Sequence, residues 1–155
     1  KDSTFAMMRE AARRGHELWA CEAREMGWRQ DSPVSTAARR IRLTGDELDW
    51  FAVEEEARIA LRDADAVVMR KDPPFDAEFI YATHLLEQAE REGARVINSP
   101  QALRNHPEKL AVMEFPQYVG PTLVTRSADD VKRFHAEHGD IVCKPLDGMG
   151  GMDMM

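Results

Sequence analysis

The sequence has little of several features that mark particular classes of protein. Two cysteines among 155 residues exclude a disulfide framework as the source of its stability. No apolar run approaches the ~20 residues that a transmembrane helix needs, and no signal-peptide core is visible. With a formal net charge of −7, the chain also lacks the basic excess typical of nucleic-acid binding. We therefore expect a cytoplasmic protein that binds neither nucleic acid nor a membrane.

What the sequence does contain is typical of a globular protein. Hydrophobic residues make up 43% and charged residues 32% of the chain, which is ordinary for a packed domain. The length suits one domain, or one domain and part of another. Cys21 and Cys143 each lie in an apolar run, which is typical of buried, reduced thiols. The chain starts without methionine and stops four residues after a glycine-rich segment, so we expect an internal fragment.

Strand-like and helix-like segments alternate over residues 1–98. Helical spacing covers residues 5–14, and Asp76 is placed to cap a second helix that ends before Gly93. Strands are predicted at 17–21, 66–69 and 95–98, with a β-hairpin inside 28–43. Residues 54–56, three glutamates, are interpreted as a solvated helical turn or a polar connector. Short links between such elements predict an α/β fold with a doubly wound parallel sheet.

The later residues begin a second unit. Pro100 and Pro107 each open a predicted short helix, and Ser127 with Asp130 forms a capping-box pattern before a longer one. Apolar runs at 122–125 and 141–144 are interpreted as strands.

The segment after residue 140 combines a lysine with a run of glycines. Residues 141–143 form an apolar run that delivers Lys144 into the loop Asp147-Gly148-Met149-Gly150-Gly151. A buried ammonium is costly unless an anion lies beside it, and glycines let a backbone approach a phosphate closely. The pairing therefore predicts a nucleotide-phosphate site, with Lys109 as a further cation upstream, although a solvated lysine is the ordinary explanation for that residue.

Two familiar phosphate motifs do not fit this loop. A P-loop carries its lysine after the last glycine, whereas Lys144 precedes the loop. The dinucleotide fingerprint requires glycine at position 153, which holds Asp153. The short glycine pattern alone is a weak signal, so its meaning depends on the rest of the chain.

Several longer motifs occur together in one order and resemble the bacterial glutathione synthetase family. The similarity runs from position 1 to 151 and is weakest between about 23 and 60. The segments that carry it are Lys1-Asp2-Ser3-Thr4-Phe5-Ala6-Met7, Arg70-Lys71-Asp72-Pro73-Pro74-Phe75-Asp76, Glu78-Phe79-Ile80-Tyr81-Ala82-Thr83, Asn98-Ser99-Pro100-Gln101-Ala102-Leu103-Arg104, Glu108-Lys109-Leu110 and Lys144-Pro145-Leu146-Asp147-Gly148-Met149-Gly150-Gly151.

The resemblance implies an ATP-dependent ligase that joins γ-glutamylcysteine to glycine through an acyl phosphate, with Mg²⁺, on an ATP-grasp fold. It implies an N-terminal domain over residues 1–105 that lacks its first strand, and a truncated ATP-grasp domain over 106–155. Lys109 and Lys144 match lysines that contact nucleotide phosphates, and the loop from Asp147 to Gly151 matches the mobile glycine-rich loop. We expect the Mg²⁺ ligands outside this chain and assign none within it. Family members assemble as homo-oligomers.

Other interpretations remain beside this one. Arg70 and Asp72 lie at a strand end, where ligand residues gather in α/β sheets, and they are candidates for substrate binding. A mutual salt bridge that fixes the proline turn explains them equally well. The chain also fits another ATP-grasp carboxylate–amine ligase, or a non-catalytic module that folds without binding anything productively. We expect the isolated fragment to be inactive.

Overall fold

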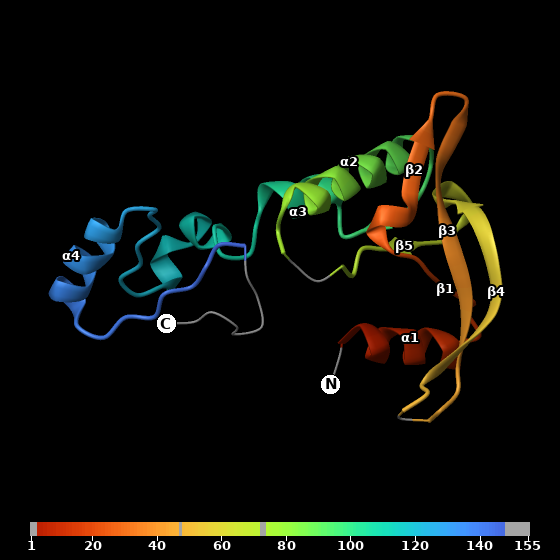
Figure 1. Ribbon diagram of the computed structural model, residues 1–155, viewed down its shortest axis with the longest axis horizontal. Helices are drawn as coiled ribbons and strands as arrows, with labels where there is room; N and C mark the ends of the chain where they lie inside the picture. Colours follow the sequence, from red (N-terminus) through yellow and green to blue (C-terminus); the bar gives the residue numbers. More distant parts are fainter. Residues whose placement is uncertain (1–2, 47, 72–73, 148–155) are drawn as a thin grey trace.

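The computed structural model of the protein describes residues 3–46, 48–71 and 74–147 (Figure 1). The chain opens with α1 (Ser3–Arg13), which ends before Gly15 at a φ of 82°. A left-handed backbone of this kind is easiest for glycine, so Gly15 stops the helix. The helix predicted over residues 5–14 is confirmed.

An antiparallel sheet follows α1. Its strands are β1 (Leu18–Ala20), β2 (Met26–Arg29), β3 (Ser32–Leu43) and β4 (Phe51–Ala60), and every pairing within it is antiparallel. Both β1 and β2 pair with β3 along one edge, while β4 pairs with it along the other. A short 3-10 turn, Ala23–Glu25, separates β1 from β2.

This sheet corrects the prediction of a doubly wound parallel sheet over residues 1–98. Only two residues join β2 to β3, and seven join β3 to β4. Connections of that length turn the chain back on itself and give antiparallel neighbours, whereas a parallel pair needs a crossover of a dozen residues or more. The hairpin predicted inside residues 28–43 is confirmed, although β3 extends it through a second hairpin into β4.

The glutamates at 54–56 lie in β4, so their assignment to a helical turn or connector was wrong. Each of them forms an ion pair with an arginine on β3: Glu54 with Arg42 at 2.8 Å, Glu55 with Arg40 at 3.3 Å and Glu56 with Arg39 at 3.6 Å. These pairs supply cross-strand contacts where β4 is exposed on both faces.

The buried side of β3 changes along its length. Val34, Thr36 and Ala38 are buried near the start, whereas Ile41 is the buried residue near the end. Since successive side chains in a strand point to opposite faces, the burial moves from one face to the other. The change coincides with a β-bulge, because Arg40 pairs with Glu55 while Ile41 pairs with Val53.

A β-bulge increases the local twist of the paired strands, and β3 contacts two helices, α1 and α2. Val34 packs in one cluster with Leu86 and Ala89 of α2. Helix α1 also contacts β3, and its Phe5 ring meets Trp50 edge-on at 5.4 Å beside the first residue of β4. The antiparallel sheet therefore supports both α1 and α2.

The parallel pairing that the sequence predicts is found between β5 (Val67–Val68) and β6 (Val96–Ile97), joined by α2 (Ala77–Arg91). The side chain of Asp76 caps α2 by accepting a hydrogen bond from the Phe79 N–H at 2.8 Å, as expected. The hydrophobic core lies between α2, these two strands and the start of β3. Its buried members are Val34, Leu61, Leu86, Ala89, Ala94 and Val96.

Helix α3 (Pro100–Asn105) follows β6 and contacts α2, and the 3-10 turn Leu61–Asp63 lies between β4 and β5. Arg104 of α3 forms an ion pair with Glu87 of α2 and donates to the Thr83 hydroxyl at 3.3 Å. The hydrogen bond that the Glu87 carboxylate accepts from Arg104 lowers the pKa of Glu87. The two helices are therefore joined by a half-buried charged contact.

Residues 106–147 lie on the opposite side of α3 from the sheet (Figure 1). They contain the 3-10 turns Ala111–Glu114 and Pro116–Tyr118, and then α4 (Ala128–His138), which Ser127 caps by accepting from the Asp130 N–H at 3.3 Å. The capped helix is confirmed, but Pro107 opens hydrogen-bonded turns rather than an α-helix. Within the described range, no helix is both long and apolar enough to span a membrane.

The strands predicted at 122–125 and 141–144 are absent from this region of the structure. An extended segment becomes a strand only when a neighbour satisfies its backbone donors and acceptors, and these apolar runs pair with no other described segment. The buried thiols were also a wrong prediction, because Cys21 is exposed and Cys143 is half-buried; both are free.

Candidate functional site

Arg70 lies two residues beyond the carboxyl end of β5 and reaches α1. Its Nη2 donates to the Ser3 hydroxyl at 2.7 Å, and its Nε donates to the Thr4 hydroxyl at 3.3 Å. Ser3 and Thr4 belong to the first turn of α1, so these bonds join two segments that are far apart in the sequence. The predicted site residue is thereby placed at the N-terminal end of a helix.

The positive charge of Arg70 faces neutral acceptors. Among the residues that the structure describes, no carboxylate forms an ion pair with it, whereas Arg39 and Arg104 each pair with a glutamate. Asp72, the predicted companion of Arg70, lies outside the described residues. The alternative of an Arg70–Asp72 salt bridge therefore stays a prediction.

The predicted nucleotide loop begins beside the segment that follows Arg70. The backbone N–H of Phe75 donates to the carbonyl oxygen of Asp147 at 3.4 Å. Phe75 is anchored in turn by its ring, whose centre lies 5.1 Å from that of Phe79 on α2. The structure therefore places Asp147, the first residue of the predicted nucleotide loop, beside the segment that follows Arg70.

The rest of that loop, Gly148, Met149, Gly150 and Gly151, lies outside the described residues. Asp147 itself is exposed. Its carbonyl accepts from the backbone N–H of Phe75, and its carboxylate forms no ion pair with any described residue.

The two candidate lysines lie in different settings from those expected. Lys144 is exposed and lies in an irregular segment, not at the end of a buried strand. The prediction of a buried ammonium is therefore wrong, because residues 141–143 do not pair into a sheet that would enclose it. Lys109 is half-buried in the turn that Pro107 opens, where the Pro107 carbonyl accepts from two following backbone N–H groups at 2.9 Å.

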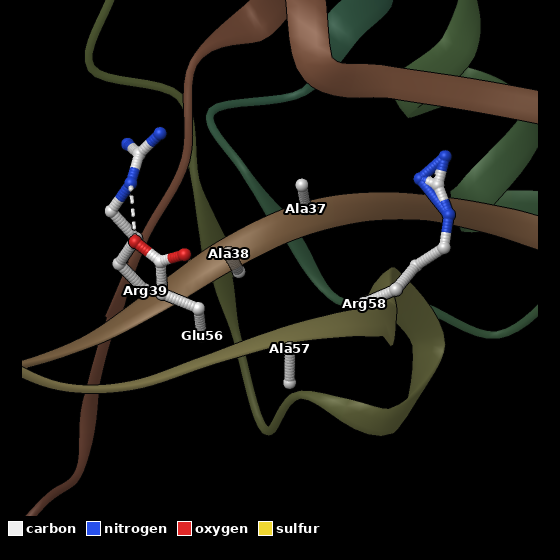
Figure 2. A pocket seen from close by; sticks show the side chains of 6 residues that line it. All are labelled: Ala37, Ala38, Arg39, Glu56, Ala57 and Arg58. Atoms are coloured by element: carbon white, nitrogen blue, oxygen red, sulfur yellow. Dashed lines mark ion pairs between the residues drawn. The ribbon is translucent and has the colours of Figure 1, made fainter.

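A shallow hollow lies elsewhere, on the antiparallel sheet. Figure 2 shows Arg39 and Glu56 meeting across β3 and β4 at one end of it, with Arg58 at the other end. Three alanines form the remainder of its lining: Ala37, Ala38 and Ala57. None of the predicted site residues takes part, so this hollow is separate from the candidate site.

The residues described here hold no cluster of three or more histidine, cysteine, aspartate or glutamate side chains that would bind a metal ion. In nucleotide sites, Mg²⁺ is usually bound by one or two carboxylates together with substrate phosphates and waters, not by a cage of protein side chains. We therefore assign no Mg²⁺ ligand among the described residues.

Sequence reasoning missed the role of Ser3 and Thr4. Hydroxyls at the start of a helix commonly cap it, but the structure uses both of these hydroxyls to hold Arg70. Their occurrence in one of the resembling motifs was the available signal. Periodicity alone gives no means of connecting residue 3 with residue 70.

In the comparison with known proteins, two family models together match all of the chain except residues 105–107. Residues 1–104 match the N-terminal domain of prokaryotic glutathione synthetase, and residues 108–155 match its ATP-grasp domain. The two matches follow each other without overlap.

Curated relatives give the same result. The chain is 53% identical over 151 residues to the glutathione synthetase of Ralstonia nicotianae, with 97% of this chain and 46% of the relative covered. It is 49% identical over 153 residues to that of Nitrosomonas europaea, with 97% and 48% covered. The corresponding values for Vibrio parahaemolyticus are 48% over 151 residues, with 97% and 48% covered. The chain therefore spans about half the length of the curated relatives it matches.

Proposed function

We propose, given that this chain belongs to the prokaryotic glutathione synthetase family, that a full-length protein carrying it joins γ-glutamylcysteine to glycine with ATP. The observation that supports this most directly is the pair of family matches, which follow one another along the chain and are accompanied by relatives about half identical to it. We further propose that the domain boundary lies near residue 105, with 1–105 and 106–155 in separate domains.

The chemistry requires activation before ligation. A carboxylate does not lose an oxide ion to an amine, so ATP first converts it to an acyl phosphate that carries a good leaving group. Negative charge builds up during phosphoryl transfer, and fixed positive charge stabilises it. In our proposal Lys109 and Lys144 supply that charge from this chain. The exposure of Lys144 supports the role, since its ammonium is accessible to a polyphosphate.

We assign the loop Asp147–Gly151 to closure over the phosphates. Glycines permit close approach of the backbone to phosphate oxygens, and a closed loop excludes the water that would hydrolyse an acyl phosphate. The bond between Phe75 and Asp147 supports this assignment, because it tethers the first residue of the loop beside the segment that follows Arg70.

Arg70 and Asp72 are proposed to bind the amino-acid substrates. The support is the position of Arg70 beyond a parallel strand and the absence of an ion-pair partner for it in the described part of the chain. Mg²⁺ is expected to accompany ATP in this family, but we assign it no ligand here and derive no step through it.

Two further proposals are the cellular compartment and the oligomeric state of the full-length protein. We infer a cytoplasmic homo-oligomer, in line with a biosynthetic reaction that consumes ATP. Size-exclusion chromatography with light scattering on the full-length protein tests the oligomeric state.

The function is tested by incubating the full-length protein with ATP, γ-glutamylcysteine and glycine. We expect phosphate release that requires both amino-acid substrates, with glutathione identified by mass spectrometry. Reactions that lack one substrate, or contain a different carboxylate or amine, serve as controls. Efficient turnover of a different pair of carboxylate and amine substrates, without glutathione formation, would favour another ATP-grasp ligase instead.

A further inference from the structure

Two neighbouring hydroxyls hold one edge of the Arg70 guanidinium. Nε donates to Thr4 Oγ1 at 3.3 Å, and Nη2 donates to Ser3 Oγ at 2.7 Å. Both hydroxyls come from the first turn of α1, an 11-residue helix that contacts β1 and β3. The arginine side chain is therefore fixed against a regular element, not against a loop.

The remaining donors of Arg70 point away from this contact. A guanidinium carries five N–H donors in one plane, and the two bonds to α1 use one from Nε and one from Nη2. No described residue accepts from the other three donors, two on Nη1 and one on Nη2. The outer pair of nitrogens forms the fork that binds both oxygens of a carboxylate side by side.

The two groups that accept from Arg70 are uncharged hydroxyls, so they do not neutralise its guanidinium. A hydroxyl orients an arginine without neutralising it, whereas a carboxylate neutralises it. Elsewhere in the described residues, arginines that are held by side chains pair with acids, as Arg13 does with Glu10 and Arg104 with Glu87. Arg70 is oriented by hydroxyls, and no carboxylate of the described residues neutralises its positive charge.

We propose that Ser3 and Thr4 are positioning residues that aim the outer fork of Arg70 at a carboxylate of one amino-acid substrate. The inference rests on the proposed function, which assigns Arg70 to substrate binding. An arginine that is already ordered loses less rotamer freedom when its ligand binds. The hydroxyls therefore act on affinity for the carboxylate, and they act through Arg70.

The test uses the full-length protein and three variants: Arg70→Ala, Ser3→Ala and Thr4→Val. Steady-state kinetics give KM for γ-glutamylcysteine, glycine and ATP. We expect Arg70→Ala to raise KM for one amino-acid substrate. Ser3→Ala and Thr4→Val should raise the same KM by roughly 3- to 10-fold, the net effect of one typical hydrogen bond, and leave KM for ATP within about 2-fold.

Two further comparisons separate positioning from mere stabilisation. Ser3→Thr keeps the hydroxyl and should restore KM, whereas Ser32→Ala, which removes an exposed hydroxyl at the start of β3, should change nothing. In the Arg70→Ala background, Ser3→Ala should have no further effect on KM, because the two residues act as one unit. Thermal unfolding of every variant monitors folding.

Several results would overturn the inference. One is a fall in the unfolding temperature of Ser3→Ala with unchanged KM values, and another is full additivity of the Ser3 and Arg70 substitutions. Unchanged constants in Arg70→Ala would also overturn it, while leaving the ligase reaction intact. If the protein makes no glutathione, the proposed function fails. In that case, calorimetry measures the affinity of the protein for γ-glutamylcysteine and for glycine. The inference requires that Ser3→Ala weakens the binding of one of these two ligands.

Discussion

The carboxylate of Glu92, at the C-terminal end of α2, accepts a hydrogen bond from the backbone N–H of Val34 at 2.7 Å. Val34 is fully buried near the start of β3, so this bond ties the helix to the antiparallel sheet. The Gln88 amide also donates to Glu92, at 2.9 Å. Together with a hydrogen bond from the Trp28 side chain, these contacts lower the pKa of Glu92.

The lowered pKa predicts an acid-sensitive contact. Because the folded pKa lies below the unfolded value of ~4.3, the ionised carboxylate stabilises the fold above that pH, and the stabilisation is lost as pH falls through the folded pKa. We expect Glu92→Gln to lower the unfolding temperature at pH 7 and to lower it less at pH 3. Circular dichroism melts across this range measure the difference.

The control for that experiment is Glu78→Gln. Glu78 lies exposed in the first turn of the same helix and accepts no hydrogen bond from a described side chain or backbone group. Its substitution should shift the melting temperature little at either pH. Equal pH profiles for the two variants would contradict the assignment to Glu92.

The packing of Leu86 in the hydrophobic core predicts that truncating this side chain destabilises the fold. Leu86 is 2% exposed and packs with Val34, Leu61 and Ala89. Leu86→Ala should lower the free energy of unfolding by about 2–5 kcal/mol, because it removes buried methyl groups and leaves a cavity. Urea unfolding gives the value, and Tyr81→Ala, at a residue 60% exposed on the same helix, should have a much smaller effect.

Lys144→Ala tests the proposed phosphate contact. In the full-length protein we expect KM for ATP to rise or turnover to fall by about ten-fold or more, since one fixed charge near a transferring phosphoryl group has effects of that size. Lys132→Ala is the matched control, because that exposed lysine pairs with Asp129 on α4. Unchanged ATP kinetics for Lys144→Ala would remove this residue from the site.

The isolated 155-residue chain should not turn over ATP in the presence of γ-glutamylcysteine and glycine. It spans about half the length of its curated relatives, and its described residues hold no metal-binding cluster. A phosphate-release assay with the full-length protein as the positive control makes the comparison. Substrate-dependent turnover by the isolated chain would show that the site is complete within it.

The features that the sequence predicted well depend on residues that are close together in the chain. The caps formed by Asp76 and Ser127 each bond an N–H three residues later, so a local pattern suffices to find them. The parallel pair β5–β6 was also accessible, because the intervening helix is long enough to cross over.

The features that it missed depend on distant partners. Three consecutive glutamates at 54–56 show no strand alternation, and the arginines that pair with them lie on β3. Likewise, the hydroxyls that orient Arg70 are separated from it by more than sixty residues. The prediction that Lys144 lies buried at a strand end was wrong for a related reason. The apolar residues at 141–143 form a strand only if another segment pairs with them.

The bulge at Glu54 bears on which changes this protein tolerates. Glu54 is the extra residue of the bulge, so deleting it would leave Ile41 opposite Val53 and Leu43 opposite Phe51 and remove only the local distortion. Replacing Glu54 with another amino acid keeps the count and forfeits only an exposed ion pair with Arg42. In homologous proteins, loss or replacement of the residue in the bulge should therefore leave the neighbouring cross-strand pairs in place.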